Sequence, residues 1–204
     1  MLNIIEPKDH HLHTSKISSL LSLLKIYQNF SLLPEKKETA TFIIAENKKF
    51  GVYGGAVVFS QNIKDLYPKL ASAFLEFLPE NDQIWSVRLC FCLDQGERFL
   101  TLEGLEICEK FYQDLHQSLQ EVGQKKDIHY FAITLQLEDY RNTLTYGRWN
   151  YLLDVPSSES SDYRFHGLLV FKNKEAFESE AQEEGFDLYD QDYTDRPYTD
   201  RPVQ

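Results

Sequence analysis

The three cysteines are the first side chains whose type and spacing could do chemistry. Cys90 and Cys92 stand two residues apart in an apolar run, so on a strand their side chains share one face. Such a thiolate pair could bind a metal or act as a nucleophile, yet no second pair of ligands follows at the spacing of a zinc site. We interpret both, like Cys108 in its own apolar segment, as buried apolar side chains of a protein from a reducing compartment.

Histidines and carboxylates offer the other candidate chemistry. The histidine cluster comprises His10, His11 and His13. It could ligate a metal, but no carboxylate or cysteine accompanies it at a fixed spacing, so the pattern favours a solvated helix start and we predict no metal site. The candidate general bases near strand ends are Glu46, Asp94 and Glu97, and the simpler interpretation of each is a solvated loop carboxylate.

Charge and missing motifs exclude several function classes. The chain has 32 acidic and 21 basic residues, a net charge of −11 whose field repels phosphate backbones and anionic lipids. No apolar run reaches the roughly 18 residues of a membrane span, and no signal core stands at the start. The G-x-S-x-G elbow, the P-loop and the dinucleotide fingerprint are missing, which disfavours hydrolases, NTPases and dehydrogenases. We therefore expect a cytoplasmic protein with neither nucleic-acid nor membrane partners.

Length and composition predict one folded domain. The 204 residues, 42% of them hydrophobic, are enough to bury a proper core. We assign residues 1–185 to this domain and residues 186–204 to an acidic, flexible tail. The tail contains the direct repeat Tyr193–Pro197 and Tyr198–Pro202, which is too short for a solenoid and whose alternative interpretation is a docking peptide.

The centre of the chain reads as strand, turn, helix and strand. The first strand is Ile84 to Leu93 and the second is Ile128 to Leu135, with a breaker at residues 123–127 before it. The helix between them carries apolar residues at helical spacing: Leu102, Leu105, Phe111, Tyr112, Leu115 and Leu119. Two apolar strands joined by a helix form a crossover unit, so they should be parallel, with ligands near their carboxyl ends.

Other elements flank this unit. We expect strands at residues 2–5, 39–46, 52–60, 151–155 and 164–171, and helices at 14–30, 63–78, 137–146 and 173–184. Thr14 or Ser15 should cap the first helix, and Pro34 with residues 35–38 should form a loop. The strands 39–46 and 52–60 should pair as an antiparallel hairpin, in which Gly54-Gly55 marks a bulge or a close backbone approach.

This order of elements, over residues 2–171, resembles the GNAT superfamily of acyl-CoA-dependent acyltransferases. The resemblance implies a mixed α/β (α+β) fold: a mostly antiparallel central sheet, helices on both faces, and a parallel strand pair that forms the cofactor cleft. The helix 63–78, Ile84-Trp85 and Gly147-Arg148-Trp149 are similar to the acyl-homoserine-lactone synthase branch. Ser86 stands where that branch has glutamate, and its arginine is displaced to Arg88, so we take this branch as a guide to the fold and not to activity.

The resemblance also implies a site for acetyl-CoA or another acyl-CoA as substrate. The pantetheine arm would lie along the strand at Cys90, Phe91, Cys92 and Leu93. The pyrophosphate would sit on the turn that opens the next helix, where unsatisfied amides favour an anion. The residues of this turn assigned to it are Gln95, Gly96, Arg98 and Thr101. Phe99 and Leu100 replace the small residues usual in the family, and Arg98 is the compensating cation.

The family chemistry then assigns the remaining roles. A tyrosine after the second central strand protonates the departing thiolate, which points to Tyr146, next to Gly147, or to Tyr140. The acceptor would be the amine of a small molecule or peptide, attacked directly and without a metal. The unusual pyrophosphate turn motivates the alternative, a non-catalytic GNAT-like binding or regulatory module. A metal enzyme built on the histidine cluster is a third class, and a homodimer is left open.

Overall fold

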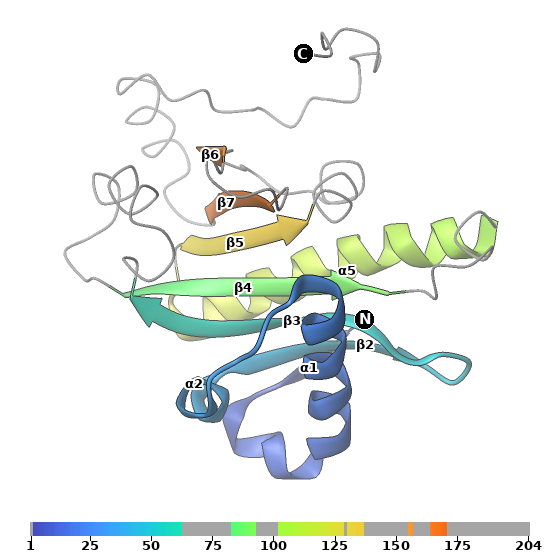
Figure 1. Cartoon of the computed structure of the whole chain (residues 1–204), viewed down its shortest axis with the longest axis horizontal. Helices are drawn as coiled ribbons and strands as arrows, with labels where there is room; N and C mark the ends of the chain where they lie inside the picture. Colours follow the sequence, from blue (N-terminus) through green and yellow to red (C-terminus); the bar gives the residue numbers. More distant parts are fainter. Residues whose placement is uncertain are drawn as a thin grey trace, which may run out of the picture.

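The described part of the chain forms one seven-stranded sheet. In the computed structural model the described residues are 2–62, 83–92, 102–128, 130–136, 155–156 and 164–170. The strands are β1 (Asn3–Ile5), β2 (Thr41–Asn47), β3 (Gly51–Asn62), β4 (Gln83–Phe91), β5 (Tyr130–Gln136), β6 (Val155–Pro156) and β7 (Arg164–Val170). Their order in the sheet is β1-β2-β3-β4-β5-β7-β6 (Figure 1).

Strand direction confirms the predicted mixed sheet. β4 and β5 pair in parallel, as expected of a strand-helix-strand crossover. The other pairs are antiparallel, including the predicted hairpin of β2 with β3 and the pair of β6 with β7. The sheet is therefore mostly antiparallel, with its one described parallel pair at the centre.

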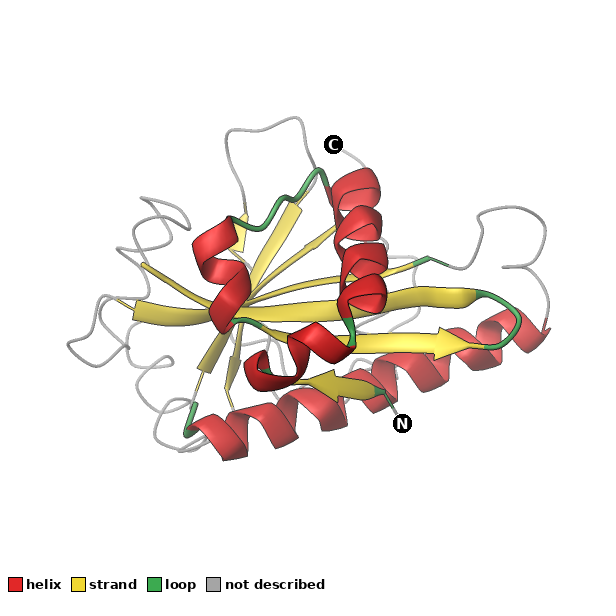
Figure 2. Ribbon diagram, turned by 90° about the horizontal axis from the view of Figure 1, so that it is seen from below, coloured by secondary structure: helices red, strands yellow, loops and turns green. Residues whose placement is uncertain are grey.

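Helices cover both faces of the sheet. The 3₁₀ helix η1 (Pro7–Leu12) leads into α1 (Thr14–Gln28) and the short α2 (Pro34–Thr39), and α5 (Leu102–Lys126) connects β4 to β5. Alternate residues of the central strands pack against different helices: Ile43, Val58 and Leu89 against α5, but Phe42, Val57 and Cys90 against α1. Figure 2 shows α1 and the long α5 on opposite sides of the strands. None of the described helices is long and apolar enough to cross a membrane.

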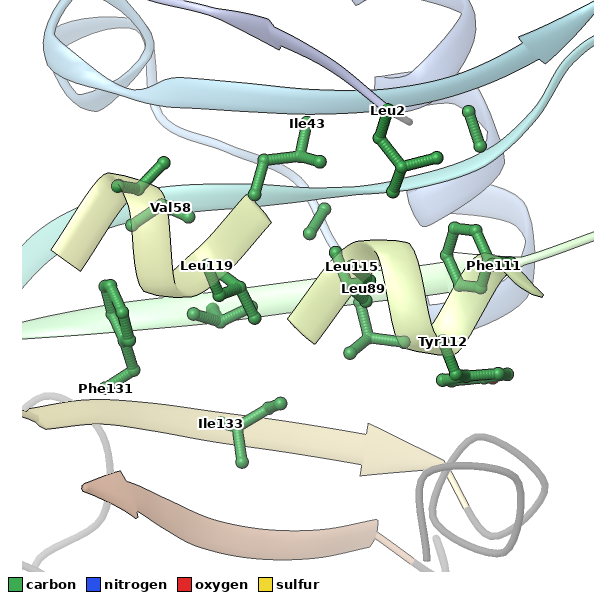
Figure 3. Close-up of a cluster of buried hydrophobic side chains, with 14 of the residues drawn as sticks. Leu2, Ile43, Val58, Leu89, Phe111, Tyr112, Leu115, Leu119, Phe131 and Ile133 are labelled. Carbon is green, nitrogen blue, oxygen red and sulfur yellow. The ribbon is translucent and has the colours of Figure 1, made fainter. Parts of the chain in front are cut away.

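The α5 face holds the larger hydrophobic core. Phe111, Leu115 and Leu119 are at most 1% exposed and lie over the strands, as Figure 3 shows. Their helical spacing predicted this burial correctly. Leu105 was expected on the same face, but it is 42% exposed, because the residues of the first turns that face the core are Gly104 and Cys108, and Leu105 lies at the margin of the buried stripe.

Three predicted boundaries were wrong. Residues 123–126 belong to α5, which ends at Asp127 in the left-handed conformation (φ 51°), so Gly123 lies within the helix. Pro34 begins α2 instead of a loop, because proline suits the first turn of a helix. The cap of α1 is His13 without a side-chain bond, since Thr14 is already helical and its Oγ1 donates to the carbonyl of His10 at 3.3 Å.

Gly54 and Gly55 bring three strands close together. Ala45 lies opposite Gly54 but Glu46 lies opposite Val52, so Tyr53 is the extra residue of a β-bulge. A Cβ on Gly54 would be 2.7 Å from the carbonyl oxygen of Cys90, and one on Gly55, at φ +152°, would be 2.2 Å from that of Ile43. The predicted bulge and close approach are both confirmed.

The predicted helices 63–78, 137–146 and 173–184, the strand residues 151–154 and the tail with its repeat lie outside the described residues.

Replacing Gly55 by alanine should destabilise the sheet far more than the same change at Gly51. Gly55→Ala sets a Cβ against backbone and should lower the free energy of unfolding by about 2–4 kcal/mol. Gly51 also has positive φ (+66°) but open space around it, so Gly51→Ala should cost only about 1 kcal/mol. Urea titration of both variants measures the difference, and equal costs would contradict the close approach.

A second pair of variants tests which face of α5 is buried. Leu115→Ala should lower the free energy of unfolding by about 2–5 kcal/mol, because a fully buried side chain leaves a cavity. Leu105→Ala, the same change on the same helix at an exposed position, should cost about 0.5 kcal/mol or less. Thermal and urea unfolding would show the contrast, and a costlier Leu105→Ala would mean that the helix is rotated.

Candidate functional site

The parallel strands β4 and β5 stop pairing before either strand ends. They pair over four positions, from Trp85 opposite Phe131 to Arg88 opposite Thr134. β4 then continues to Phe91 and β5 to Gln136, and these described strand ends do not pair with each other. Ligands of α/β sheets bind outside the carboxyl ends of such strands, so this divergence is the candidate site.

The structure describes part of the predicted cofactor set. Cys90, Phe91 and Cys92 lie together at the carboxyl end of β4, beside the divergence. The remaining predicted site residues lie outside the described residues: Leu93, Gln95, Gly96, Arg98, Thr101, Tyr140 and Tyr146. α5 begins at Leu102, the residue after those predicted to bind the pyrophosphate.

The backbone of Phe91 faces β5. The Cys92 N–H donates to the Tyr53 carbonyl of β3 at 2.7 Å, which fixes the side of β4 to which each residue directs its backbone groups. Because this direction alternates along a strand, the N–H and C=O groups of Leu89 and Phe91 point the other way, toward β5. The backbone groups of Phe91 are therefore directed toward the divergence.

The side chains at this end of β4 divide between the two faces. Cys90 is 1% exposed and packs in the α1 core, with the half-buried Cys92 against the same core. Neither cysteine is in a disulfide, and the prediction of apolar, buried cysteines is confirmed for Cys90 and in part for Cys92. Their contribution to the site is packing on the α1 face and, for Cys92, the backbone bond to Tyr53.

An aromatic cluster holds the end of β4 on the α5 face. It consists of Tyr53, Phe91, Phe111 and Tyr112. The ring centroids of Phe91 and Phe111 are 4.9 Å apart, and Tyr53 meets Phe91 edge-on at 6.0 Å. The cluster fixes Phe91 by its ring, so that its backbone is held in position at the divergence.

Tyr53 is a member of this cluster that the sequence reasoning did not single out. Burial raises the pKa of its phenol above 10.0, and the nearby Asp114 carboxylate raises it further. Burial alone would also raise the pKa of Asp114, but its hydrogen bonds, including that from Lys110 Nζ at 3.0 Å, hold it below the ordinary value. Tyr53 is thus a protonated phenol near an ionised carboxylate at neutral pH. The neighbouring Gly54-Gly55 is the feature of the sequence that could have drawn attention to Tyr53.

The α1 face beside the divergence carries cations on aromatic rings. Arg88, the last β4 residue paired with β5, lies with its guanidinium 5.3 Å from the centroid of Phe30. Phe30 stacks on Phe59 at 5.7 Å, and Lys36 Nζ lies 5.7 Å from the Phe59 ring. Arg88 and Cys90 lie on the same face of β4, as strand alternation in the sequence predicts. The sequence does not predict the aromatic partner of Arg88, because Phe30 follows α1 and is far from β4 along the chain.

Gln28, the last residue of α1, reaches this same place. Its side chain is 6% exposed and its Nε2 donates to the carbonyl of Leu89. Leu89 is the first β4 residue past the pairing with β5. The sequence reasoning missed this residue, because a polar residue at the end of an amphipathic helix is usually solvated.

Two predicted loop side chains have structural partners instead of solvent. Glu46 forms an ion pair with Lys16, and its Oε1 accepts from Asn3 Nδ2 at 2.9 Å, so it joins β1, α1 and β2 and is not a solvated carboxylate. His10 Nε2 lies 3.0 Å from the carbonyl oxygen of Ala40, and its ring meets Phe42 edge-on. His10 is therefore tied to the start of β2. Asp94 and Glu97 lie outside the described residues.

The described residues contain no group of three or more histidines, cysteines or carboxylates that could hold a metal ion.

Comparison with known proteins connects this arrangement to a fold. No protein-family model matches the chain, and no curated protein matches it. Among solved structures, the CoA-dependent acyl-homoserine lactone synthase BjaI with MTA has a TM-score of 0.58 at 12% identity, covering 92% of this chain and 90% of its own. The same synthase with SAM and isopentyl-CoA has a TM-score of 0.57, again at 12% identity and with 92% and 90% covered.

A second kind of enzyme shares the fold. FeeM, an N-acyl amino acid synthase from uncultured soil microbes, has a TM-score of 0.50 at 12% identity over 86% of this chain and 94% of its own. The chain therefore has the GNAT fold of acyl-CoA N-acyltransferases, with similarity to the acyl-homoserine lactone synthase branch.

Proposed function

We propose that the chain is an acyl-CoA-dependent N-acyltransferase that moves an acyl group, most simply acetyl, from CoA to the amine of a small molecule or peptide. The observation that carries this proposal is the divergence of β4 and β5 after Arg88 and Thr134, with the backbone of Phe91 facing it. The fold supports it, since one structural neighbour was solved with isopentyl-CoA.

The substrate binds along the carboxyl end of β4. The pantetheine arm carries amide groups, which can hydrogen-bond main-chain groups at this end of the strand as an added strand would. The aromatic cluster holds Phe91 in place for this role. We assign the pantetheine arm to the residues from Cys90 to Leu93.

The pyrophosphate binds where α5 begins. Leu102 opens a helix of 25 residues, whose first N–H groups and dipole favour an anion. Gln95, Gly96 and Thr101 supply further donors in the preceding turn, and Arg98 supplies positive charge. The positive charge of Arg98 compensates for the bulky Phe99 and Leu100 and attracts the anion despite the net charge of −11 of the whole chain.

The reaction is a direct transfer. The neutral amine attacks the thioester carbonyl carbon, the carbon–sulfur bond breaks, and the amine nitrogen loses a proton to solvent or a base. The departing thiolate takes a proton from Tyr146, or from Tyr140 in its place. The products are an amide and free CoA, with no electron transfer and no metal involved.

Calorimetric titration with acetyl-CoA and octanoyl-CoA tests binding and its determinants. The wild-type chain should bind at least one ester with micromolar affinity. Arg98→Ala should weaken binding about tenfold, because a charge-assisted hydrogen bond to phosphate is lost. Lys125→Ala removes an exposed cation from the last turn of α5 and should leave the affinity unchanged.

Turnover separates the tyrosines from the binding residues. With a panel of amines and detection of released CoA thiol, Tyr146→Phe should keep the binding affinity and lower turnover about 100-fold. If Tyr140→Phe alone shows this loss, Tyr140 is the acid. No binding of any CoA ester by a folded wild-type chain would contradict the proposal and favour the non-catalytic binding module.

A further inference from the structure

Gln28 is a buried polar side chain held rigidly at the end of α1. It is 6% exposed, while Leu24 one turn earlier is fully buried. The helix ends at Asn29 in the left-handed conformation, with the N–H of Phe30 donating to the carbonyl of Leu24 at 3.2 Å. Phe30 in turn stacks on Phe59. The orientation of Gln28 is therefore set by the backbone on both sides of it.

The bond of Gln28 to β4 lies on the side of the divergence. Gln28 Nε2 donates to the Leu89 carbonyl, and the Cys92–Tyr53 bond shows that Leu89 directs its backbone groups toward β5. Pairing with β5 has ended one residue earlier, at Arg88. A buried carbonyl needs a donor, and here the carboxamide of Gln28 supplies one in place of a β5 N–H.

The same bond places the Gln28 carboxamide at the start of the divergence. Because the Leu89 carbonyl is engaged by Gln28, the next β4 groups that face β5 are those of Phe91. Gln28 ends α1, whose apolar residues pack with Cys90 and Val57 on this face of the sheet. An acyl group carried past Phe91 toward α1 would meet the Gln28 side chain.

We propose that Gln28 is a specificity-determining residue that limits the length of the acyl group. The inference rests on the proposed acyl-CoA function and deepens it: the side chain closes the α1 side of the divergence and restricts the site to short acyl esters. Shortening Gln28 makes room for longer chains. A side chain of equal length without a donor keeps the limit and loses the bond to Leu89.

The test is calorimetric binding of acetyl-CoA, butanoyl-CoA, octanoyl-CoA and decanoyl-CoA to four proteins. These are the wild-type chain, Gln28→Ala, Gln28→Met and the control Ile26→Ala, each checked for folding by circular dichroism. Ile26 lies on the same helix but is 72% exposed, so its replacement leaves the site intact. Gln28→Met matches glutamine in length and removes only the polar group.

The wild type and Ile26→Ala should prefer the short esters. Gln28→Ala should raise the ratio of octanoyl-CoA to acetyl-CoA affinity at least tenfold, the effect of a few methylene groups in an apolar site. Gln28→Met should keep the wild-type ratio even if its thermal stability falls, which separates length from the hydrogen bond.

Each contrary result has its own meaning. If the wild type binds esters but the affinity ratio of Gln28→Ala equals that of the wild type, the role of Gln28 is overturned and the acyl-CoA function stands. If Gln28→Ala does not fold, Gln28→Asn, which is one methylene shorter and keeps the carboxamide, takes its place: a ratio shifted toward long chains supports the role, and an unchanged ratio overturns it. If no ester binds any folded protein, the proposed function fails and this inference fails with it.

Discussion

The early end of the pairing between β4 and β5 is the constraint on which the site depends. Strand pairing normally satisfies every backbone group of a central strand, but past Arg88 and Thr134 the two strands continue unpaired with each other. Other groups must then pair with the backbone of β4. Gln28 does so at Leu89, where its carboxamide donates to the carbonyl.

The packing on both faces keeps this end of β4 in place. On the α5 face, Phe91 packs within the aromatic cluster, and on the opposite face Cys90 packs in the α1 core. Beneath them, Gly54 and Gly55 let β3 approach β2 and β4 so closely that no side chain fits. The bulge at Tyr53 then supplies the carbonyl that orients Cys92. Tertiary packing thus holds the position of a backbone edge, which suits a site that binds through main-chain groups.

The sequence predicted the parts of the fold that depend on local patterns. The hairpin pattern of β2 and β3, helical spacing in α1 and α5, and the crossover rule were enough to place the sheet and its parallel pair. The errors arose where tertiary packing decides the outcome: Leu105 lies at the margin of the buried stripe of α5, and Gly123 continues the helix despite its low helix propensity. Gln28 was missed because its partner, Leu89, is 61 residues away in sequence. The assignment of Cys90, Phe91 and Cys92 to the candidate site came from the family resemblance. No pattern of residues in this chain would have predicted it alone.

The most direct test of the account follows the backbone amide of Phe91 by nuclear magnetic resonance while acetyl-CoA is added to the ¹⁵N-labelled chain. The account predicts a large, saturable shift of the Phe91 amide, with little change at Val57, which pairs with Arg88 inside the sheet. If CoA esters bind but shift other amides and leave Phe91 unchanged, the substrate binds elsewhere. In that case the divergence of β4 and β5 would not be the site.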